Sequence, residues 1–390
     1  MIICNFDECT GCSACFSICK HEAIQMKVLA DGFIHPIIDT NKCVDCKLCQ
    51  HVCPSNSYSK LNPPQKVYLS YTNYEENRVE SSSGGVFSAI ATDVLRKGGV
   101  VYGASYDENM NVCHRSIKDE NDLFLLQGSK YVQSSVGDCF CEIKKHLKEN
   151  TLVYFVGTPC QVAGLKNYLL KDYPNLITSD LICHGCPSND LFIKQINEIS
   201  SKERGKIINF KFRSKKRFGQ GCDLQAIIKR NSIVNKFYNA ELFPYFYGFW
   251  HNITLRESCY ACKYASILRT GDITLADYWK VKKYHKGVKT SKGTSLILVN
   301  TDKGLDICKA CEENKSLNLV EDSVSNALKV QGHLSHPVKK PLAHDKFIKD
   351  YSNLSWEELK RKYLTPSFAY MLKMRIRNIV KLLTLYKLWK

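Results

Sequence analysis

The 390-residue sequence contains no apolar run that approaches the roughly 18–20 residues of a bilayer-spanning helix. Its start, MIICNFDECT, lacks the basic and apolar segments of a secretory signal. Hydrophobic residues make up 44% and charged residues 24%, the mixture typical of a soluble globular protein. These properties argue against disorder, collagen-like repeats, signal-directed export and a multi-span membrane protein, and we expect a cytoplasmic location.

Cysteine, in contrast, is abundant, with 20 residues in the chain. In a reducing compartment such cysteines serve metal or redox chemistry more often than disulfides. Two runs of the pattern C-x-x-C-x-x-C-x-x-x-C lie 34 residues apart. The runs are Cys9, Cys12, Cys15 and Cys19, followed by Cys43, Cys46, Cys49 and Cys53.

This spacing is that of bacterial two-cluster ferredoxins, in which the fourth cysteine of each run ligates the other run's cluster. It predicts one 4Fe–4S cluster on Cys9, Cys12, Cys15 and Cys53 and a second on Cys19, Cys43, Cys46 and Cys49. Zinc on the same thiolates is the alternative, although a four-ligand zinc site requires no interleaved repeat.

The pattern of segments predicts an α/β fold preceded by a small α+β diferredoxin domain over residues 1–57. Residues 58–66 are polar, contain two adjacent prolines and predict a linker. Strand-like and helix-like segments then alternate, which predicts a mixed-sheet domain over residues 67–350. Residues 366–390 differ in character and predict a basic amphipathic C-terminal helix.

Four further cysteines lie in contexts that suit a third metal site. Cys160 follows a strand in GTPCQVAGL, Cys183 ends a strand in DLICHG, and Cys259 and Cys262 form a C-x-x-C pair. Side chains of this kind gather at the carboxyl edge of open α/β sheets. The residues alone leave two interpretations open, a third cluster and buried structural cysteines.

Several segments, taken together and in order, resemble motifs of the coenzyme F420 hydrogenase/dehydrogenase beta-subunit family. They are SSSGGVFSAI, GSKYVQS, GTPCQVAGL, DLICHGCPS, INFKFRSKK, SCYACKYASILRTGDITLADYW and KGTSLILVNT. The resemblance implies an iron–sulfur flavoprotein with FAD beside a third 4Fe–4S cluster, whose ligands match Cys160, Cys183, Cys259 and Cys262. Cys186 is a rival fourth ligand. Cys308 and Cys311 fall outside the motifs and are predicted to be an incidental pair on an exposed helix.

The flavin interpretation also names candidate residues. The helix start at Ser83, Gly84 and Gly85 offers backbone N–H groups to a phosphate or a flavin ring, with a capped helix start as the alternative. The other cofactor-binding candidates are Ser129, Lys130, Gln133, Thr158, Gln161 and Arg269. Because no G-x-G-x-x-G motif opens a strand–helix–strand unit, a nicotinamide cofactor is not the first choice.

Lys130 and His184 are the candidates for catalytic roles, Lys130 against the flavin and His184 as a proton donor. An exposed loop lysine and a histidine satisfied by local backbone are the respective alternatives. For Arg269, the alternative to cofactor binding is a structural ion pair with Asp272.

The net charge is +17, and residues 202–236 hold eleven basic residues against two acids. A solvated face is the default interpretation of such a run, and an anionic cofactor tail, an acidic ferredoxin or nucleic acid are the alternatives. Residues 366–390 contain six basic residues and no acid. For this tail we expect peripheral contact with the inner face of a membrane, a groove of a partner, or packing on its own domain.

The sequence thus predicts an iron–sulfur flavoprotein oxidoreductase. Electrons would move between ferredoxin-type clusters and FAD, with hydride transfer to or from a deazaflavin or another organic substrate. The alternatives are a ferredoxin-dependent reductase of a small molecule, for example in cell-surface polysaccharide synthesis, and a non-catalytic electron-transfer subunit. Expected partners are a ferredoxin or another redox protein and a small-molecule substrate, and no nucleic acid.

Overall fold

The computed structural model describes residues 2–57, 60–217, 219, 221, 223–288 and 291–388. Each predicted segment has residues outside these ranges. They are residue 1 of the N-terminal domain, 58 and 59 of the linker, 218, 220 and 222 of the basic run, 289 and 290 of the mixed-sheet domain, and 389 and 390 of the C-terminal helix.

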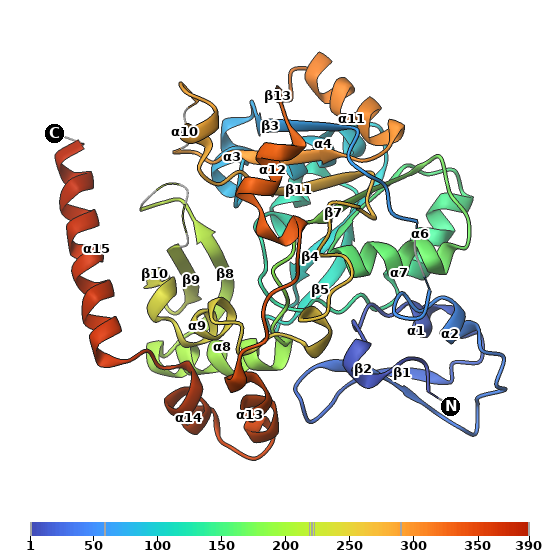
Figure 1. The fold of residues 1–390 in the computed structure, drawn as a ribbon, viewed down its shortest axis with the longest axis horizontal. Coiled ribbons are helices and arrows are strands. Elements are labelled where there is room, and N and C mark those ends of the chain that lie inside the picture. Colours follow the sequence, from blue (N-terminus) through green and yellow to red (C-terminus); the bar gives the residue numbers. More distant parts are fainter. Residues whose placement is uncertain are drawn as a thin grey trace.

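Residues 2–57, here called the N-terminal segment, form a small α+β unit, drawn in dark blue in Figure 1. Its elements are η1 (Phe6–Glu8), α1 (Ala14–Ile18), β1 (Ile24–Val28), β2 (Ile34–Ile38) and α2 (Leu48–His51). β1 and β2 pair antiparallel with Ile24 opposite Ile38. In the turn between them Gly32 takes a left-handed φ of 79°, which a residue without a Cβ adopts without strain.

The largest element is a mixed sheet of eight strands in the order β13-β3-β12-β11-β7-β6-β4-β5. The strands are β3 (Lys66–Thr72), β4 (Val100–Tyr106), β5 (Val112–Ile117), β6 (Val153–Gly157), β7 (Leu176–Leu181), β11 (Ile273–Asp277), β12 (Ser295–Val299) and β13 (Leu317–Asp322). β4, β6, β7 and β11 are parallel to one another, and the other neighbours are antiparallel. The predicted α/β fold with a mixed sheet is confirmed.

Helices cover both faces of this sheet. α4 (Val86–Arg96) and α11 (Asp302–Glu313) pack on one face with Tyr154, while α6 (Cys139–Lys148) and α7 (Pro159–Leu169) pack on the other with Phe155. This two-sided burial explains why β6 reads as an uninterrupted apolar run. The shorter elements are α3 (Glu75–Glu80), α5 (Leu123–Leu126), α10 (Val281–Tyr284), α12 (Val324–Val330), η2 (Glu120–Asp122), η4 (Glu257–Cys259) and η5 (Gly332–Leu334).

A separate antiparallel sheet in the order β10-β9-β8 lies beside the main sheet (Figure 1). It comprises β8 (Lys206–Ser214), β9 (Asp223–Lys229) and β10 (Ile233–Asn239), covered by α8 (Asn189–Glu203), η3 (Ala240–Leu242), α9 (Pro244–Trp250), α13 (Leu342–Tyr351), α14 (Trp356–Leu359) and η6 (Lys360–Leu364). Aromatic rings such as Phe192, Phe210 and Phe212 fill its core. Most of the motif INFKFRSKK therefore lies in β8, a strand of this second sheet and not of the main one.

The N-terminal segment packs on α6 and α7 through a shared apolar core. Ala14 and Ile18 of α1 belong to the same buried cluster as Phe140 and Leu165. The chain then passes along residues 60–65, where Asn62 and Arg269 exchange backbone hydrogen bonds of 2.9 and 2.8 Å. The segment is therefore joined to the rest by its side chains as well as by the linker.

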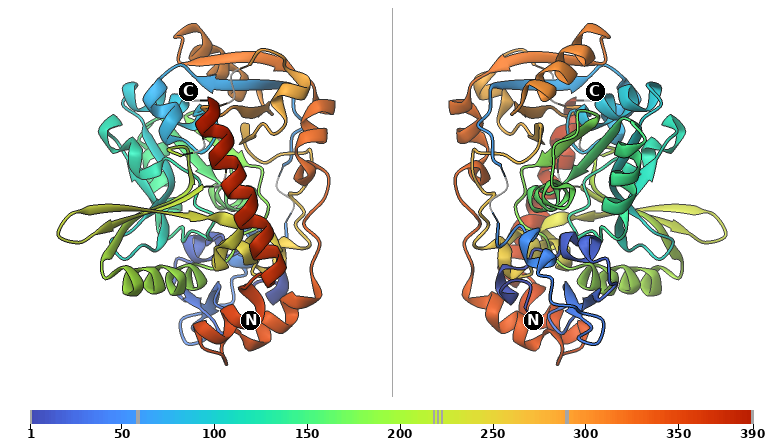
Figure 2. Two further views of the ribbon diagram at one scale, coloured as in Figure 1. Left: turned by 90° about the vertical axis from the view of Figure 1, so that its left-hand side faces the viewer. Right: turned by 90° about the vertical axis from the view of Figure 1, so that its right-hand side faces the viewer.

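The C-terminal helix α15 (Phe368–Leu388) lies on the other side of the molecule from the N-terminal segment (Figure 1). Figure 2 shows in its left view that the helix runs along the outside of the protein. None of the described helices combines the length and the apolar character needed to cross a membrane.

Candidate functional site

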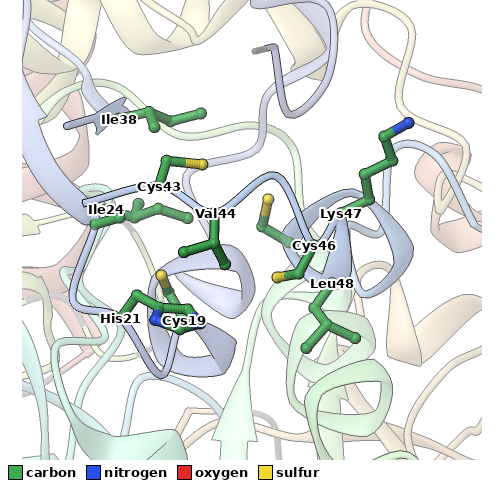
Figure 3. Close-up of a pocket in the computed structure, with 11 residues that line it drawn as sticks. Cys19, His21, Ile24, Ile38, Cys43, Val44, Cys46, Lys47 and Leu48 are labelled. Atoms are coloured by element: carbon green, nitrogen blue, oxygen red, sulfur yellow. The ribbon is translucent and has the colours of Figure 1, made fainter. Parts of the chain in front are cut away.

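Four cysteines from both runs of the repeat line one cavity of the N-terminal segment. They are Cys19, Cys43, Cys46 and Cys49, here called the surface set. Figure 3 shows Cys19, Cys43 and Cys46 around a common space. Cys46 is exposed, and its neighbours Val44 and Leu48 are 60% and 40% exposed. This cavity therefore lies at the protein surface.

A second cavity of the segment is lined by Cys9, Cys12, Cys15 and Cys53, here called the inner set. All four of these cysteines are buried. Each set thus combines three cysteines of one run with the fourth of the other. Cys4 also lines the inner cavity and hydrogen-bonds with the sulfurs of Cys9 and Cys53. Sequence reasoning missed Cys4 because it precedes the repeat.

The donor atoms fit iron–sulfur cubanes better than single zinc ions. Within the described ranges, no three cysteine sulfurs all lie within 4.8 Å of one another. A tetrahedral zinc ion with Zn–S bonds of about 2.3 Å holds its sulfurs roughly 3.8 Å apart. Burial raises the pKa of the Cys12 thiol to about 12. At neutral pH this thiol ionises only where a metal replaces its proton.

Five more cysteines gather at the carboxyl edge of the parallel neighbours β6 and β7, and we call them the core set. They are Cys160, Cys183, Cys186, Cys259 and Cys262. Cys160 lies in the first turn of α7, directly after β6, and Cys183 follows β7. Burial and then the charge of Cys183 raise the pKa of the thiols of Cys259 and Cys262.

Cys186 belongs to this group as closely as the four predicted ligands do. It hydrogen-bonds with Cys183, and this hydrogen bond, burial and the charge on Cys183 hold the pKa of the Cys186 thiol above its usual range. Five sulfurs are therefore available for the four positions that a cubane offers.

A capping box fixes Cys160 at the start of α7. The Thr158 backbone N–H donates to Gln161 Oε1 at 3.0 Å, and Thr158 Oγ1 lies 3.1 Å from Cys160 Sγ. Gln161 Nε2 in turn donates to Ser134 Oγ at 3.0 Å. The sequence predicts flavin contacts for Thr158 and Gln161, whereas in the structure their polar groups position Cys160.

Arg256 connects the core set to the inner set, and no sequence motif marks it. Its backbone N–H donates to the carbonyl of Cys186 at 3.0 Å, and its carbonyl accepts from the N–H of Cys259 at 2.9 Å. Its guanidinium, in a residue only 3% exposed, donates to the carbonyls of Cys9 and Ile34 at 2.5 and 3.0 Å. A buried positive charge therefore lies between two groups of metal-binding thiols and offsets the negative charge that ionisation would bring.

Helix α7 provides a second connection. Cys12 Sγ faces Gly164 so closely that a Cβ added there would lie 2.9 Å from the sulfur. Gly164 is one helical turn beyond Cys160, so the two cysteines meet the same face of α7. The absence of a side chain at Gly164 allows the inner set to approach the core set.

The loops predicted to hold FAD also meet, at the N-terminus of α4. The Ser129 backbone N–H donates to Ser82 Oγ at 2.7 Å, which joins two motifs distant in sequence. Ser83 Oγ donates to the carbonyl of Thr294 at 2.7 Å, which adds the start of β12. Gly85 has a left-handed φ of 86° at the N-cap of the helix.

Polar groups beside these loops are suited to bind an anionic group or the polar edge of a cofactor. The hydroxyls Ser70 Oγ and Thr294 Oγ1 are buried and have no hydrogen-bond partner among the described residues. The backbone of Gly84 lies against Ser70, since a Cβ there would be 2.6 Å from the Ser70 carbonyl. Lys215, which sequence reasoning missed, donates to the Ser83 carbonyl at 2.6 Å, and burial lowers its pKa to about 7. Glycine backbone, orphan hydroxyls and a basic group are suited to a phosphate or a flavin ring.

Lys130 and Gln133 make other contacts. Lys130 Nζ donates to the Gln127 carbonyl at 2.9 Å beside the end of α5, and burial lowers its pKa to about 7. Gln133 Nε2 donates to the Thr10 carbonyl at 3.2 Å, and its Oε1 accepts from Arg256 at 3.2 Å. Gln133 therefore lies at the contact with the N-terminal segment.

Arg269 is a buried structural residue. It pairs with Asp180 at 2.9 Å, and the two side chains are 1% and 0% exposed. It also donates to the carbonyls of Leu181 and Tyr264 at 3.0 and 2.9 Å. The structural ion pair that the sequence left open is present, but its acid is Asp180 and not Asp272. The guanidinium ties the end of β7 to the loop that carries the C-x-x-C pair.

His184 is hydrogen-bonded through both ring nitrogens. Its Nδ1 lies 2.8 Å from His333 Nε2, and its Nε2 lies 2.7 Å from Asn252 Oδ1. Burial lowers the pKa of His184 to about 4. The ring is therefore held by two side chains distant in sequence, and not by the local backbone that the sequence offered as the alternative to a proton donor.

One prediction about exposure is wrong. Cys308 and Cys311 are helical as expected, in α11, but both are 0% exposed and pack in the core. In the basic run most charged residues are exposed, as on a solvated face. Arg213 differs, because its side chain is 1% exposed and pairs with Asp277 at 2.7 Å.

One further group resembles a metal site in its geometry. The ligand atoms of Glu257, His344 and Asp345 all lie within 4.8 Å of one another. Lys340 Nζ, however, lies 2.8 Å from Glu257 Oε1 and 2.6 Å from Asp345 Oδ1. The lysine ammonium supplies the positive charge that a metal would bring, so the group is an ion-pair network.

Comparison with known families accounts for both parts of the chain. Residues 8–57 match the family described as "4Fe-4S dicluster domain". Residues 150–324 match the family of the C-terminal part of the coenzyme F420 hydrogenase/dehydrogenase beta subunit. Over residues 150–324 the chain is therefore similar to this beta-subunit family. The surface and inner sets lie in the first match, and the core set lies in the second.

Individual relatives are distant. A coenzyme F420-dependent sulfite reductase of Methanocaldococcus jannaschii is 26% identical over 332 residues, 83% of this chain and 49% of that protein. The chain thus spans about half the length of this curated relative. A chain in the F420-reducing NiFe hydrogenase complex of Methanosarcina barkeri is similar with a TM-score of 0.48 and 14% identity, covering 70% of this chain and 90% of that one.

Proposed function

We propose that this protein is an iron–sulfur flavoprotein oxidoreductase that exchanges electrons with a redox protein and hydride with a deazaflavin such as F420 or another organic substrate. The observation that carries the proposal is the order of the three cysteine sets. The surface set is open to a partner, the inner set is buried against α7, and the core set lies behind it at the sheet edge.

Exposed side chains mark where a redox partner would dock. Val44 and Leu48 line the cavity of the surface set and are 60% and 40% exposed. When bound, the clusters would supply single-electron transfer, and FAD would convert single electrons to hydride. Arg256 and Gly164 hold the inner and core sets in contact, which supports short transfer distances between them.

The residues that would hold FAD are those gathered at the start of α4. Ser83, Gly84, Gly85 and Ser129 remain the backbone and hydroxyl contacts. Lys215 Nζ donates to the carbonyls of Arg78, Ser83 and Lys292, so it fixes the loops around them. Lys130 Nζ is bonded to backbone carbonyls beside α5, so its contribution is to fix the loop that carries Ser129. These residues orient a cofactor and do not themselves transfer electrons.

The first experiment is to purify the protein anaerobically and measure iron, sulfide and flavin per chain. We expect about twelve irons, as for three cubanes, and one FAD. The double variant Cys183→Ala with Cys186→Ala leaves three of the five core-set sulfurs and should lose about four irons, whereas Cys308→Ala, a buried cysteine outside all three sets, should lose none. About eight irons and no flavin in the parent protein would contradict the proposal.

The second step is a substrate assay with the loaded protein. Reduced F420 should be oxidised as ferredoxin is reduced, or oxidised F420 should be bleached as reduced ferredoxin is oxidised. Ferredoxin oxidation with another small-molecule acceptor but not with oxidised F420 would assign the protein to the ferredoxin-dependent reductases. No turnover by the loaded protein alone would assign it to the electron-transfer subunits.

A further inference from the structure

The outer face of α15 carries a continuous apolar stripe. Phe368, Leu372, Ile376, Ile379 and Val380 are 77%, 50%, 54%, 57% and 52% exposed. At about 100° per residue, these positions fall within about 120° of the helix circumference. Single exposed apolar residues are ordinary, but a contiguous stripe marks a contact surface.

The opposite face of α15 holds the helix to the protein. Met374 lies on that face and is 4% exposed. Arg377 pairs with Glu241 of η3, and the ring of Tyr370 lies 6.3 Å from that of Tyr247 in α9. Because these contacts fix one face, the apolar stripe is held outwards, along the side that Figure 2 shows in its left view.

Charge identifies what the stripe contacts. Lys373 and Arg375 are both exposed, and the helical rotation places one just beyond each edge of the stripe. Residues 366–390 contain six basic residues and no acid. An apolar stripe with basic residues on both margins is the arrangement of a helix that lies in the headgroup region of an anionic bilayer.

We propose that α15 binds an anionic lipid surface, with its apolar stripe among the acyl chains and Lys373 and Arg375 at the headgroups. The helix would lie in the plane of the membrane, since no described helix can cross one. Figure 1 shows α15 and the N-terminal segment on different sides of the molecule, so lipid binding leaves the surface set free for a redox partner.

The test is co-sedimentation of the anaerobically purified full chain with lipid vesicles. We expect binding to vesicles of phosphatidylcholine with phosphatidylglycerol, weaker binding in high salt, and none to phosphatidylcholine alone. Ile376→Glu should lower partitioning by roughly tenfold or more, because it places a charge in the stripe. The matched control is Leu342→Glu, a leucine 91% exposed at the start of α13, which should bind like the parent.

Three outcomes would overturn the proposal. The first is that the protein does not sediment with anionic vesicles at low salt. The second is that Ile376→Glu binds vesicles as well as the parent. The third is that the parent binds no vesicles but is a dimer in solution, which Ile376→Glu converts to a monomer. The last would assign the stripe to a second copy of the chain. Iron content confirms that each variant is folded, and the result does not depend on flavin or F420 activity.

Discussion

The surface set and the inner set share one cysteine spacing but have different surroundings. Cys46 of the surface set is exposed, and apolar side chains open to solvent lie on either side of it. Cys12 of the inner set is 6% exposed and packs against α7. Spacing along the chain therefore decides which cysteines act together, while contacts from the rest of the protein decide what each set can do.

The two sets differ most in how firmly they are tied to the remaining protein. The inner set is covered by Gly164 and by the guanidinium of Arg256, which also hydrogen-bonds near the core set. Both cavities are lined by residues of the N-terminal segment, but it is Cys12 Sγ of the inner set that lies against Gly164 of α7. A change at the inner set should therefore propagate to α7, and a change at the surface set should remain local.

Removing one ligand from each set should give the largest contrast. Cys12→Ala and Cys46→Ala should each lose about four irons per chain. Only Cys12→Ala should also loosen the contact with α7, because Cys12 faces Gly164 whereas Cys46 is exposed. Iron analysis and thermal unfolding followed by circular dichroism measure the two effects. If the two variants have equal unfolding temperatures, the two sets contribute equally to the contact between the N-terminal segment and the rest of the protein.

The next largest effect is expected from replacing Arg256, whose guanidinium connects the inner set to the core set. Arg256→Gln should leave the carbonyls of Cys9 and Ile34 poorly paired. Each buried acceptor without its donor costs about 1–3 kcal/mol. Docking of the N-terminal segment should weaken, which limited proteolysis between residues 60 and 66 detects. Arg256→Lys keeps the charge and should retain part of the protection, and a Gln variant as resistant as the parent would refute the assigned role.

A smaller effect is expected from closing the gap at α7. Gly164→Ala places a Cβ 2.9 Å from Cys12 Sγ. Overpacking of this kind costs about 1–3 kcal/mol and should outweigh the roughly 1 kcal/mol that alanine adds to helix stability. Urea unfolding measures the balance. Gly103→Ala is the control, because its nearest neighbour would lie at an ordinary 3.5 Å. A Gly164→Ala protein more stable than the parent would contradict a tight contact between Cys12 and α7.

The smallest effect should be electronic and confined to the inner set. Cys4 hydrogen-bonds with the sulfurs of Cys9 and Cys53, and hydrogen bonds to ligand sulfurs raise cluster potentials. One hydrogen bond of about 0.5–1.5 kcal/mol corresponds to roughly 20–60 mV for a one-electron couple. Cys4→Ala should lower one potential by this amount in a titration followed by electron paramagnetic resonance. The exposed Cys141→Ala should change none, and a shift in both ferredoxin-type potentials would contradict the assignment of Cys4 to one set.

Much of this architecture was open to prediction because it depends on local pattern. The buried run at Val153–Gly157, the hairpin around Gly32 and the cysteine repeat each involve neighbouring residues. The mixed sheet follows from the alternation of such segments. Strand order does not follow, because the residues of β8 indicate a strand but not that it pairs in the second sheet.

The site contacts that prediction missed are contacts between residues far apart in sequence. Arg256 reaches Cys9 across 247 positions, and Arg269 reaches Asp180 across 89. No pattern near Arg256 distinguishes it from an exposed basic residue. The capping box of Thr158 and Gln161 was missed for a different reason, since a helix cap and a cofactor contact use the same polar groups.

Burial of the inner set also sets an order for assembly. Cys12 lies beneath Gly164, and Arg256 covers Cys9 from the other side. Because docking adds these contacts, iron and sulfide should enter the inner set more readily before the N-terminal segment docks than after it. The surface set contains an exposed cysteine and should be loaded equally well in either state. Loading of the inner set and docking of the segment should therefore be coupled steps of maturation.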